Sequence, residues 1–266
     1  MAFTEHPSFR TPPSEQPLWR YIDFPRFYFL MTRKRLYLPS LASLTNDPWE
    51  GLPPPHMLNP KRSVRVCTVT AAADTPNGEQ INSVSEMEQA EVFGKDFDWY
   101  AQTLIKHSRE MKKQLFVSCW HASEYESEAF WQIYGGRGHG ICIRSTVDHL
   151  SHSLTYGAPI YGGIVEYLDE TKELLGDSCI FQNCLWKRRS FVHEKEFRAV
   201  IWEQDPTTSG IEVSVDINSL VDEIIVHPQA DEWFVKIVND LASTVSCKAN
   251  VRRSDLLSEP SYERQT

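Results

Sequence analysis

The stretch His193-Glu194-Lys195-Glu196-Phe197-Arg198-Ala199-Val200-Ile201 places two carboxylates and a guanidinium at the entrance of an apolar run. Successive side chains of a β-strand point to opposite faces, so the alternation predicts a strand with Glu194, Glu196 and Arg198 on one face. Two neighbouring carboxylates repel each other unless a positive group balances them. Arg198 can balance one of them. The other carboxylate is therefore free to act on a substrate cation or a metal ion.

The composition is that of an ordinary globular protein. The chain has 266 residues, of which 41% are hydrophobic and 24% charged, enough for one large domain with a substantial core. The net charge of -9 argues against a broad nucleic-acid footprint. Six scattered cysteines without metal-binding spacing predict reduced thiols. With no secretory signal and no apolar run long enough for a bilayer, we expect a cytoplasmic protein without a membrane partner.

Three segments are expected along the chain. Residues 1–17 contain four prolines and few large apolar residues, which predicts a flexible N-terminal arm. Residues 18–254 predict a single α+β domain with a central sheet of short strands flanked by helices. Residues 255–266 predict a polar C-terminal tail.

Hydrophobic patterning locates several elements within this domain. Apolar runs predict strands at 115–120, 141–143 and 211–215. A charged amphipathic pattern predicts a helical region over 84–113, and a second one predicts a helix over about 231–241.

Six short motifs occur in order between residues 18 and 202. They are Leu18-Trp19-Arg20-Tyr21, Leu36-Tyr37-Leu38-Pro39-Ser40 with Asn46-Asp47-Pro48-Trp49-Glu50, Val117-Ser118-Cys119-Trp120, Phe130-Trp131-Gln132-Ile133-Tyr134 with Gly138-His139-Gly140-Ile141-Cys142-Ile143, Val165-Glu166-Tyr167 and His193-Glu194-Lys195-Glu196-Phe197-Arg198. In this order they resemble the bacterial domain-of-unknown-function family 2971. Thr45 and Phe130 depart from the family pattern, which usually has Phe and Met there. Both are apolar packing positions, and the family itself implies little about function.

The order of the chemical groups also resembles the layout of ADP-ribosyltransferases, which implies an NAD-using or NAD-cleaving enzyme with an ADP-ribosyltransferase-like fold. On this resemblance Glu196 is the catalytic carboxylate, because cleavage of the nicotinamide–ribose bond builds positive charge on the ribose. Glu194 would orient or deprotonate the acceptor. The acceptor itself and the oligomeric state stay open.

The same resemblance implies the residues that bind the nucleotide. Arg20 would hold NAD in a bidentate grip, and Tyr134 would stack on the nicotinamide ring. Tyr21 and Arg198 are further expected cofactor-binding residues. Arg20 has a second interpretation, in which it forms a structural ion pair with Asp47, Glu194 or Glu196.

Two other functions are compatible with the sequence. Asp47, Glu50, Glu194 and Glu196 could form an oxygen-rich cage for Mg²⁺ or Mn²⁺ in a nuclease or phosphoesterase, although Arg198 would compete for the carboxylates and no metal is expected on the first interpretation. Alternatively, the charged residues form a buried network in a non-catalytic sensor or interaction module of a bacterial defence or stress system.

Overall fold

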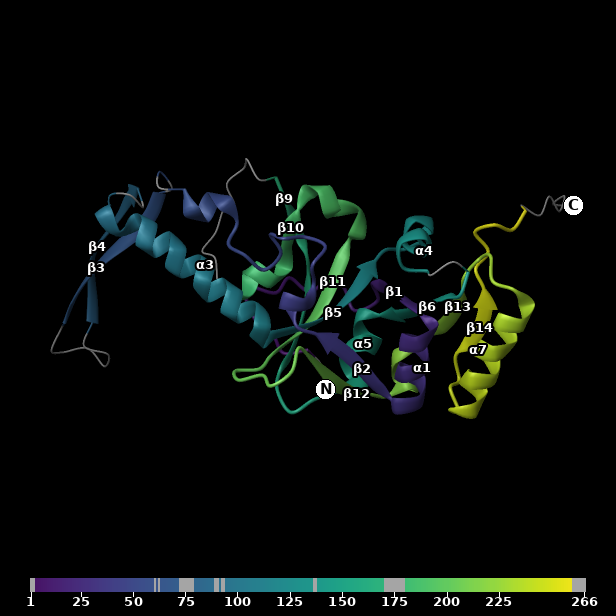
Figure 1. The fold of residues 1–266 in the computed structure, drawn as a ribbon. Helices are drawn as coiled ribbons and strands as arrows, with labels where there is room; N and C mark the ends of the chain where they lie inside the picture. The colour runs from purple at the N-terminus through teal and green to yellow at the C-terminus, as the bar shows by residue number, and fades with distance from the viewer. Residues whose placement is uncertain are drawn as a thin grey trace, which may run out of the picture.

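The computed structural model of the chain describes residues 3–59, 61, 63–71, 79–88, 91, 94–135, 138–169 and 180–259. Its centre is a seven-stranded sheet (Figure 1). In the order in which they lie side by side, its strands are β14 (Asn250–Arg253), β13 (Glu223–Val226), β6 (Gly140–Thr146), β1 (Pro17–Asp23), β5 (Leu115–Ala122), β11 (Glu196–Trp202) and β8 (Ile160–Ile164). β13 and β14 run parallel, and every other neighbouring pair is antiparallel.

Smaller sheets surround this one. A second antiparallel sheet has the order β2 (Arg35–Pro39), β12 (Gly210–Val215) and β7 (Leu154–Thr155). A bridge between Ser40 and Phe116 connects it to β5. β9 (Glu166–Leu168) and β10 (Trp186–Arg188) form a short parallel pair. β3 (Ser63–Ala71) and β4 (Glu79–Glu88) form a hairpin that lies at one end of the molecule, beyond α3 (Phe97–Gln114) (Figure 1).

The remaining helices flank the sheets. The α-helices are α1 (Phe24–Arg33), α4 (Glu128–Tyr134), α5 (Val147–Ser153), α6 (Ile217–Leu220) and α7 (Glu232–Thr244). The 3-10 helices are η1 (Leu41–Ser43), η2 (Pro55–Leu58), η3 (Gly94–Asp96), η4 (Ile180–Leu185) and η5 (Arg189–Glu194). Asp23 caps the N-terminus of α1, where its side chain accepts a hydrogen bond from the Arg26 amide at 2.8 Å. The prediction of an α+β fold with a central sheet of short strands and flanking helices is confirmed.

The two faces of the central sheet are covered differently. The main hydrophobic cluster lies on one face and includes Leu18, Trp120 and Phe197 together with residues of the flanking helices. On the opposite face lie two smaller clusters, one of which contains Val117 and Val200. Because side chains alternate along a strand, Glu196 and Arg198 lie on the same face as Val200.

Two predicted elements differ in the structure. β11 begins at Glu196, because Lys195 has a left-handed backbone (φ 41°) and Glu194 still belongs to η5, so the prediction that Glu194 lies in this strand is wrong. Residues 84–88 belong to β4 and the helix begins only at Phe97, so the helical prediction for 84–113 is wrong in its first part. Strands β5, β6 and β12 and helix α7 cover the other predicted ranges.

The N-terminal segment packs against the central sheet. Phe9 is buried, and the Thr4 amide donates a hydrogen bond to the Ile160 carbonyl oxygen at 2.8 Å. At the other end, residues 255–259 are exposed and the rest of the predicted tail lies outside the described residues. Among the helices that the structure describes, none has the length and apolarity required for a transmembrane span.

Candidate functional site

A buried ion pair forms where the sequence places its charged cluster. Arg198 and Glu196 are two residues apart on one face of β11, and the guanidinium donates from Nε and Nη2 to the two carboxylate oxygens, both at 2.9 Å. Arg198 has no exposed surface, and its Nη1 donates to the Cys184 carbonyl oxygen at 2.6 Å. Its Nη2 also contacts Glu50. Arg198 is thus fully used by the protein itself, and a role in binding a cofactor stays a prediction.

Lys187 of β10 joins a third carboxylate to this pair. Its Nζ lies 2.5 Å from Glu194, 3.0 Å from Glu196 and 3.6 Å from Glu50. Three carboxylates (Glu50, Glu194, Glu196) therefore face two cations (Lys187, Arg198), which leaves one formal negative charge. We call these five side chains the ionic cluster.

The two glutamates of the sequence motif differ in their electrostatics. Burial raises the pKa of Glu196, but the charges of Arg198 and Lys187 outweigh it and lower this pKa to about 2. For Glu194, burial, together with the charge of Glu196, outweighs the charges of Lys187 and Arg198, so its pKa is raised. The side chain of Glu194 is also 12% exposed, against 6% for Glu196. Glu194 is thus the less compensated carboxylate of the two and lies at the rim of the cluster.

Tyr134 lies beside this rim. The His121 ring contacts the Phe130 ring (4.4 Å between centroids), and Phe130 contacts Tyr134 (5.4 Å). The same His121 binds the Glu194 carbonyl oxygen through Nδ1 at 2.6 Å. Burial and the charge of Glu194 raise the pKa of Tyr134 to about 12, yet the side chain is 37% exposed. Tyr134 is thus connected to the segment of Glu194 through Phe130 and His121, and it is exposed at the surface.

Arg20 lies elsewhere. Its Nη1 donates to the Ser118 hydroxyl at 2.6 Å and to the Cys119 carbonyl oxygen at 3.1 Å, and the guanidinium lies over the Trp120 ring. Arg20 pairs in register with Ile143, which belongs to the main hydrophobic cluster on the face opposite Glu196. The structure thus forms neither of the contacts predicted between Arg20 and the motif glutamates.

Tyr21 has a packing role. Its ring lies 5.2 Å from Phe130 and 5.0 Å from Trp131, and its hydroxyl accepts a hydrogen bond from the Ser127 amide at 2.8 Å. These contacts hold α4 on the sheet, and burial raises the pKa of Tyr21. Cofactor binding by Tyr21 stays a prediction.

The expected oxygen-rich cage does not form as such. The Asp47 Oδ1 atom accepts a hydrogen bond from Arg188 Nε at 3.0 Å, and Glu50 contacts Arg198 and Lys187. Within the described ranges, no three His, Cys, Asp or Glu side chains are arranged to hold a metal ion. The carboxylate oxygens that a metal ion would require as ligands thus pair with cationic side chains of the protein.

Sequence reasoning missed several members of this site. The Tyr167 hydroxyl accepts a hydrogen bond from the Glu196 amide at 2.8 Å, and His121 and Cys119 of β5 lie opposite Glu196 and Arg198. The sequence does carry a signal for β5. Cys119 and His121 alternate with the apolar Trp120, which predicts that they lie on one face of a strand. Their pairing with β11 has no signal in a single sequence.

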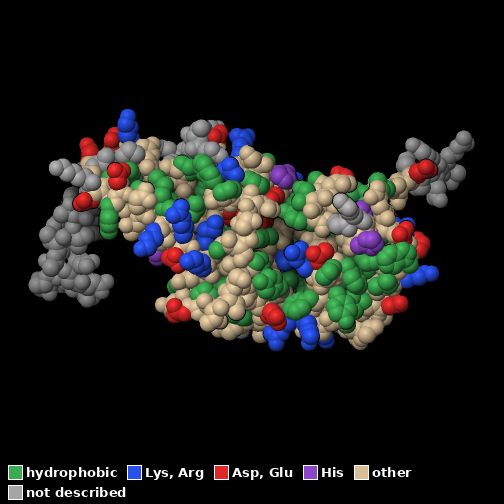
Figure 2. Space-filling model, in the orientation of Figure 1, with side chains coloured by type: hydrophobic (Ala, Val, Ile, Leu, Met, Phe, Trp, Pro, Cys, Tyr) green, Lys and Arg blue, Asp and Glu red, His purple; other side chains and the backbone are tan. Residues whose placement is uncertain are grey.

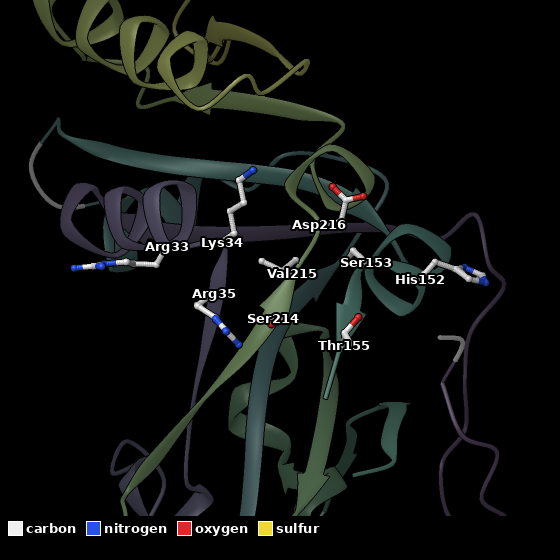
Figure 3. Close-up of a pocket in the computed structure, with 9 residues that line it drawn as sticks. All are labelled: Arg33, Lys34, Arg35, His152, Ser153, Thr155, Ser214, Val215 and Asp216. Atoms are coloured by element: carbon white, nitrogen blue, oxygen red, sulfur yellow. The ribbon is translucent and has the colours of Figure 1, made fainter. Parts of the chain in front are cut away.

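A separate cavity of about 490 Å³ lies at the second sheet (Figure 3). It is lined by Arg33, Lys34, Arg35, His152, Ser153, Thr155, Ser214, Val215 and Asp216. The side chains of Arg33 and His152 point away from its centre, so the basic groups do not converge on one point (Figure 3). On the face shown in Figure 2, lysines and arginines gather over α3, whereas exposed apolar side chains gather over α1 and α7.

Comparisons with known proteins give few matches. No family model and no curated protein matches the chain. Three solved structures of Thermus sp. 2.9 DarT are similar: in complex with ADP-ribosylated ssDNA (TM-score 0.40, 10% identity, covering 92% of this chain and 97% of that one), with carba-NAD+ (0.37, 9%, 90% and 96%) and with NAD+ (0.35, 10%, 91% and 98%). TM-scores of this size carry no argument about function, and the resemblance to family 2971 stays a prediction.

Proposed function

We propose that this protein is an NAD-cleaving, ADP-ribosyltransferase-like enzyme in which Glu194, rather than Glu196, faces the substrate. The observation that supports this choice is the position of Glu194: it is paired with one cation, its side chain is 12% exposed, and its charge acts on the exposed Tyr134. NAD is proposed from the order of the motifs in the sequence. A partly exposed carboxylate with a perturbed pKa at a surface is a typical feature of functional sites.

The chemistry requires such a carboxylate. Breaking the nicotinamide–ribose bond develops positive charge on the ribose, and a fixed negative group nearby stabilises that transition state more than the ground state. Glu194 is oriented for this by Lys187 at 2.5 Å. The exposed ring of Tyr134 offers a flat surface on which the nicotinamide can stack.

Glu196 then acts through another residue. Lys187 and Arg198 compensate the negative charge of Glu196, so Glu196 contributes little to the electrostatic potential at the protein surface. By holding Lys187 at 3.0 Å, it fixes the group that orients Glu194. We therefore assign it a positioning role in place of the catalytic role expected from the sequence.

Nicotinamide release from NAD+ tests the proposal. Glu194→Gln keeps the size of the side chain and removes its charge, so we expect the rate to fall about 100- to 1,000-fold, as for other electrostatic stabilisers. Glu110→Gln is the matched control, since this glutamate on α3 is 57% exposed and pairs only with its neighbour Lys113 among the described contacts. Equal rates for wild type and Glu194→Gln, or no release by wild type, would rule the proposal out.

A second candidate is a non-catalytic module stabilised by the ionic cluster. The observation in its favour is the closed pairing of Glu196 and Arg198, together with the position of Arg20 on the opposite face of the sheet. On this proposal, Glu196→Gln lowers the thermal midpoint while NAD+ leaves the midpoint of wild type unchanged. A rise of the wild-type midpoint with NAD+ concentration would favour the enzyme instead.

A further inference from the structure

A row of polar side chains crosses the three strands of the second sheet and lines the cavity of about 490 Å³ (Figure 3). Ser214 of β12 pairs in register with Arg35 of β2 on one side and with Thr155 of β7 on the other. Residues directly opposite each other in a sheet share one face. Their neighbours Leu36 and Val213 are buried in the main hydrophobic cluster, so the row lies on the outward face of the sheet.

The donors of this row have no partner within the protein. Lys34 and Arg35 are both exposed, and neither side chain forms a hydrogen bond or an ion pair with any residue that the structure describes. Within the same residues, the hydroxyl groups of Ser214 and Thr155 also form no hydrogen bond. Two positive charges and two hydroxyl donors are therefore available to a ligand in the cavity.

The one carboxylate among the described lining residues is used by a neighbouring helix. Asp216 accepts hydrogen bonds from the Asn218 amide at 3.1 Å and from the Ser219 hydroxyl at 2.8 Å, at the start of α6. Against this carboxylate stand the three cations of residues 33–35, which leaves two formal positive charges at the cavity. The cavity is thus locally cationic on a chain whose net charge is -9.

The two free cations are spread along the cavity. Lys34 has a left-handed backbone (φ 51°), and its carbonyl oxygen accepts a hydrogen bond from the Val215 amide at 3.0 Å. This turn joins α1 to β2, and the side chains of Lys34 and Arg35 extend from it in different directions (Figure 3). An anion with several charges in a row fits this arrangement better than an anion with one charged centre.

We infer that this cavity binds an oligophosphate, a chain of two or more linked phosphate groups. The Arg35 guanidinium and the hydroxyls of Ser214 and Thr155 contact one phosphate group, and the Lys34 ammonium contacts another. Phosphate oxygens accept hydrogen bonds from all of these donors, and the planar guanidinium matches them in a bidentate manner. The volume of about 490 Å³ is that of a small-molecule site.

The lining also indicates which part of such a ligand is recognised. Among the described lining residues the only ring is that of His152, and its side chain points away from the centre of the cavity (Figure 3). A nucleobase therefore finds no surface on which to stack. Recognition lies in the phosphate chain, whether that chain is free or part of a nucleotide.

Calorimetric titration of the full-length chain with tripolyphosphate at low salt tests the inference. Arg35→Gln removes the guanidinium, so we expect the affinity to fall about 10- to 100-fold. Arg33→Gln is the matched control, because it removes the same charge two positions earlier, where the side chain points away from the centre, and should leave the affinity nearly unchanged (Figure 3). Thr155→Val changes no charge and should lower the affinity about 2- to 10-fold, which covers the case in which Arg35→Gln does not fold.

ATP distinguishes the two sources of the ligand, because it carries the same number of linked phosphate groups as tripolyphosphate. Similar affinities for ATP and tripolyphosphate, both reduced by Arg35→Gln, would support the inference. Absence of tripolyphosphate binding to wild type would overturn it, and so would equal losses for Arg33→Gln and Arg35→Gln, since binding would then follow the overall charge. Much tighter binding of ATP, lost in Arg35→Gln, would mean that the site recognises a base and would overturn it as well.

Discussion

Arg198 shows at the scale of one residue how strongly the ionic cluster depends on its cations. It is completely buried between Glu196, Glu50 and the Cys184 carbonyl oxygen. Replacing it with Met leaves two buried carboxylates without their main partner, and removing one member of a buried ion pair typically costs about 3–5 kcal/mol. We expect Arg198→Met to lower the free energy of unfolding by this amount in urea titrations.

Arg26 provides the control for this prediction. It pairs with Asp23 at 3.2 Å, but its side chain is 75% exposed. Arg26→Met should therefore change the free energy of unfolding by less than about 1 kcal/mol. Similar losses for both variants would mean that the cluster does not carry the stability that its burial indicates.

The pKa of Glu196 gives a second prediction at this scale. This pKa is lowered in the folded protein, to about 2 from an ordinary value of 4.5. The charged form therefore stabilises the fold above pH 4.5, and this contribution is lost as the pH falls towards 2. Unfolding of wild type and Glu196→Gln, compared across this range, should show wild type more stable near neutral pH and the difference shrinking at low pH. A difference that is constant with pH would contradict it.

At the scale of elements, α4 is attached to the sheet through Tyr21. Tyr21→Phe removes the acceptor of the Ser127 amide and keeps the ring, so we expect a loss of about 1 kcal/mol in the free energy of unfolding. Tyr28→Phe is the control, because Tyr28 is 53% exposed and should show no measurable loss. If Tyr21→Phe instead leaves stability unchanged and weakens NAD+ binding, the cofactor role predicted from the sequence is supported.

The sequence predicts elements better than it predicts their boundaries. Runs such as 115–120 and 211–215 are apolar and β-branched or aromatic enough to identify β5 and β12. The start of β11 could not be predicted, because the left-handed backbone of Lys195 is not signalled by a glycine or asparagine. The alternation therefore extends the predicted strand back to Glu194, which in the structure is the last residue of η5.

At the scale of the whole molecule, the site depends on contacts between distant segments. Glu50 and Arg198 are 148 positions apart, and Lys187 reaches the glutamates from a different sheet. These residues can be identified as candidate site residues from a single sequence. That sequence does not show which strands pair with each other in the sheet. Arg20 is an example. Its place in the order of the motifs fits the predicted site, but the register of β1 puts its side chain on the face of the sheet opposite Glu196.

The central claim is that Glu194 faces a nucleotide while Glu196 is held by the protein. The pKa of the Glu194 carboxyl, followed by carbon NMR with and without saturating NAD+, tests it most directly. Free protein should show this pKa above the ordinary value, and NAD+ should lower it, because the nicotinamide ring carries a positive charge. A Glu194 pKa that does not change when NAD+ is added would contradict the account.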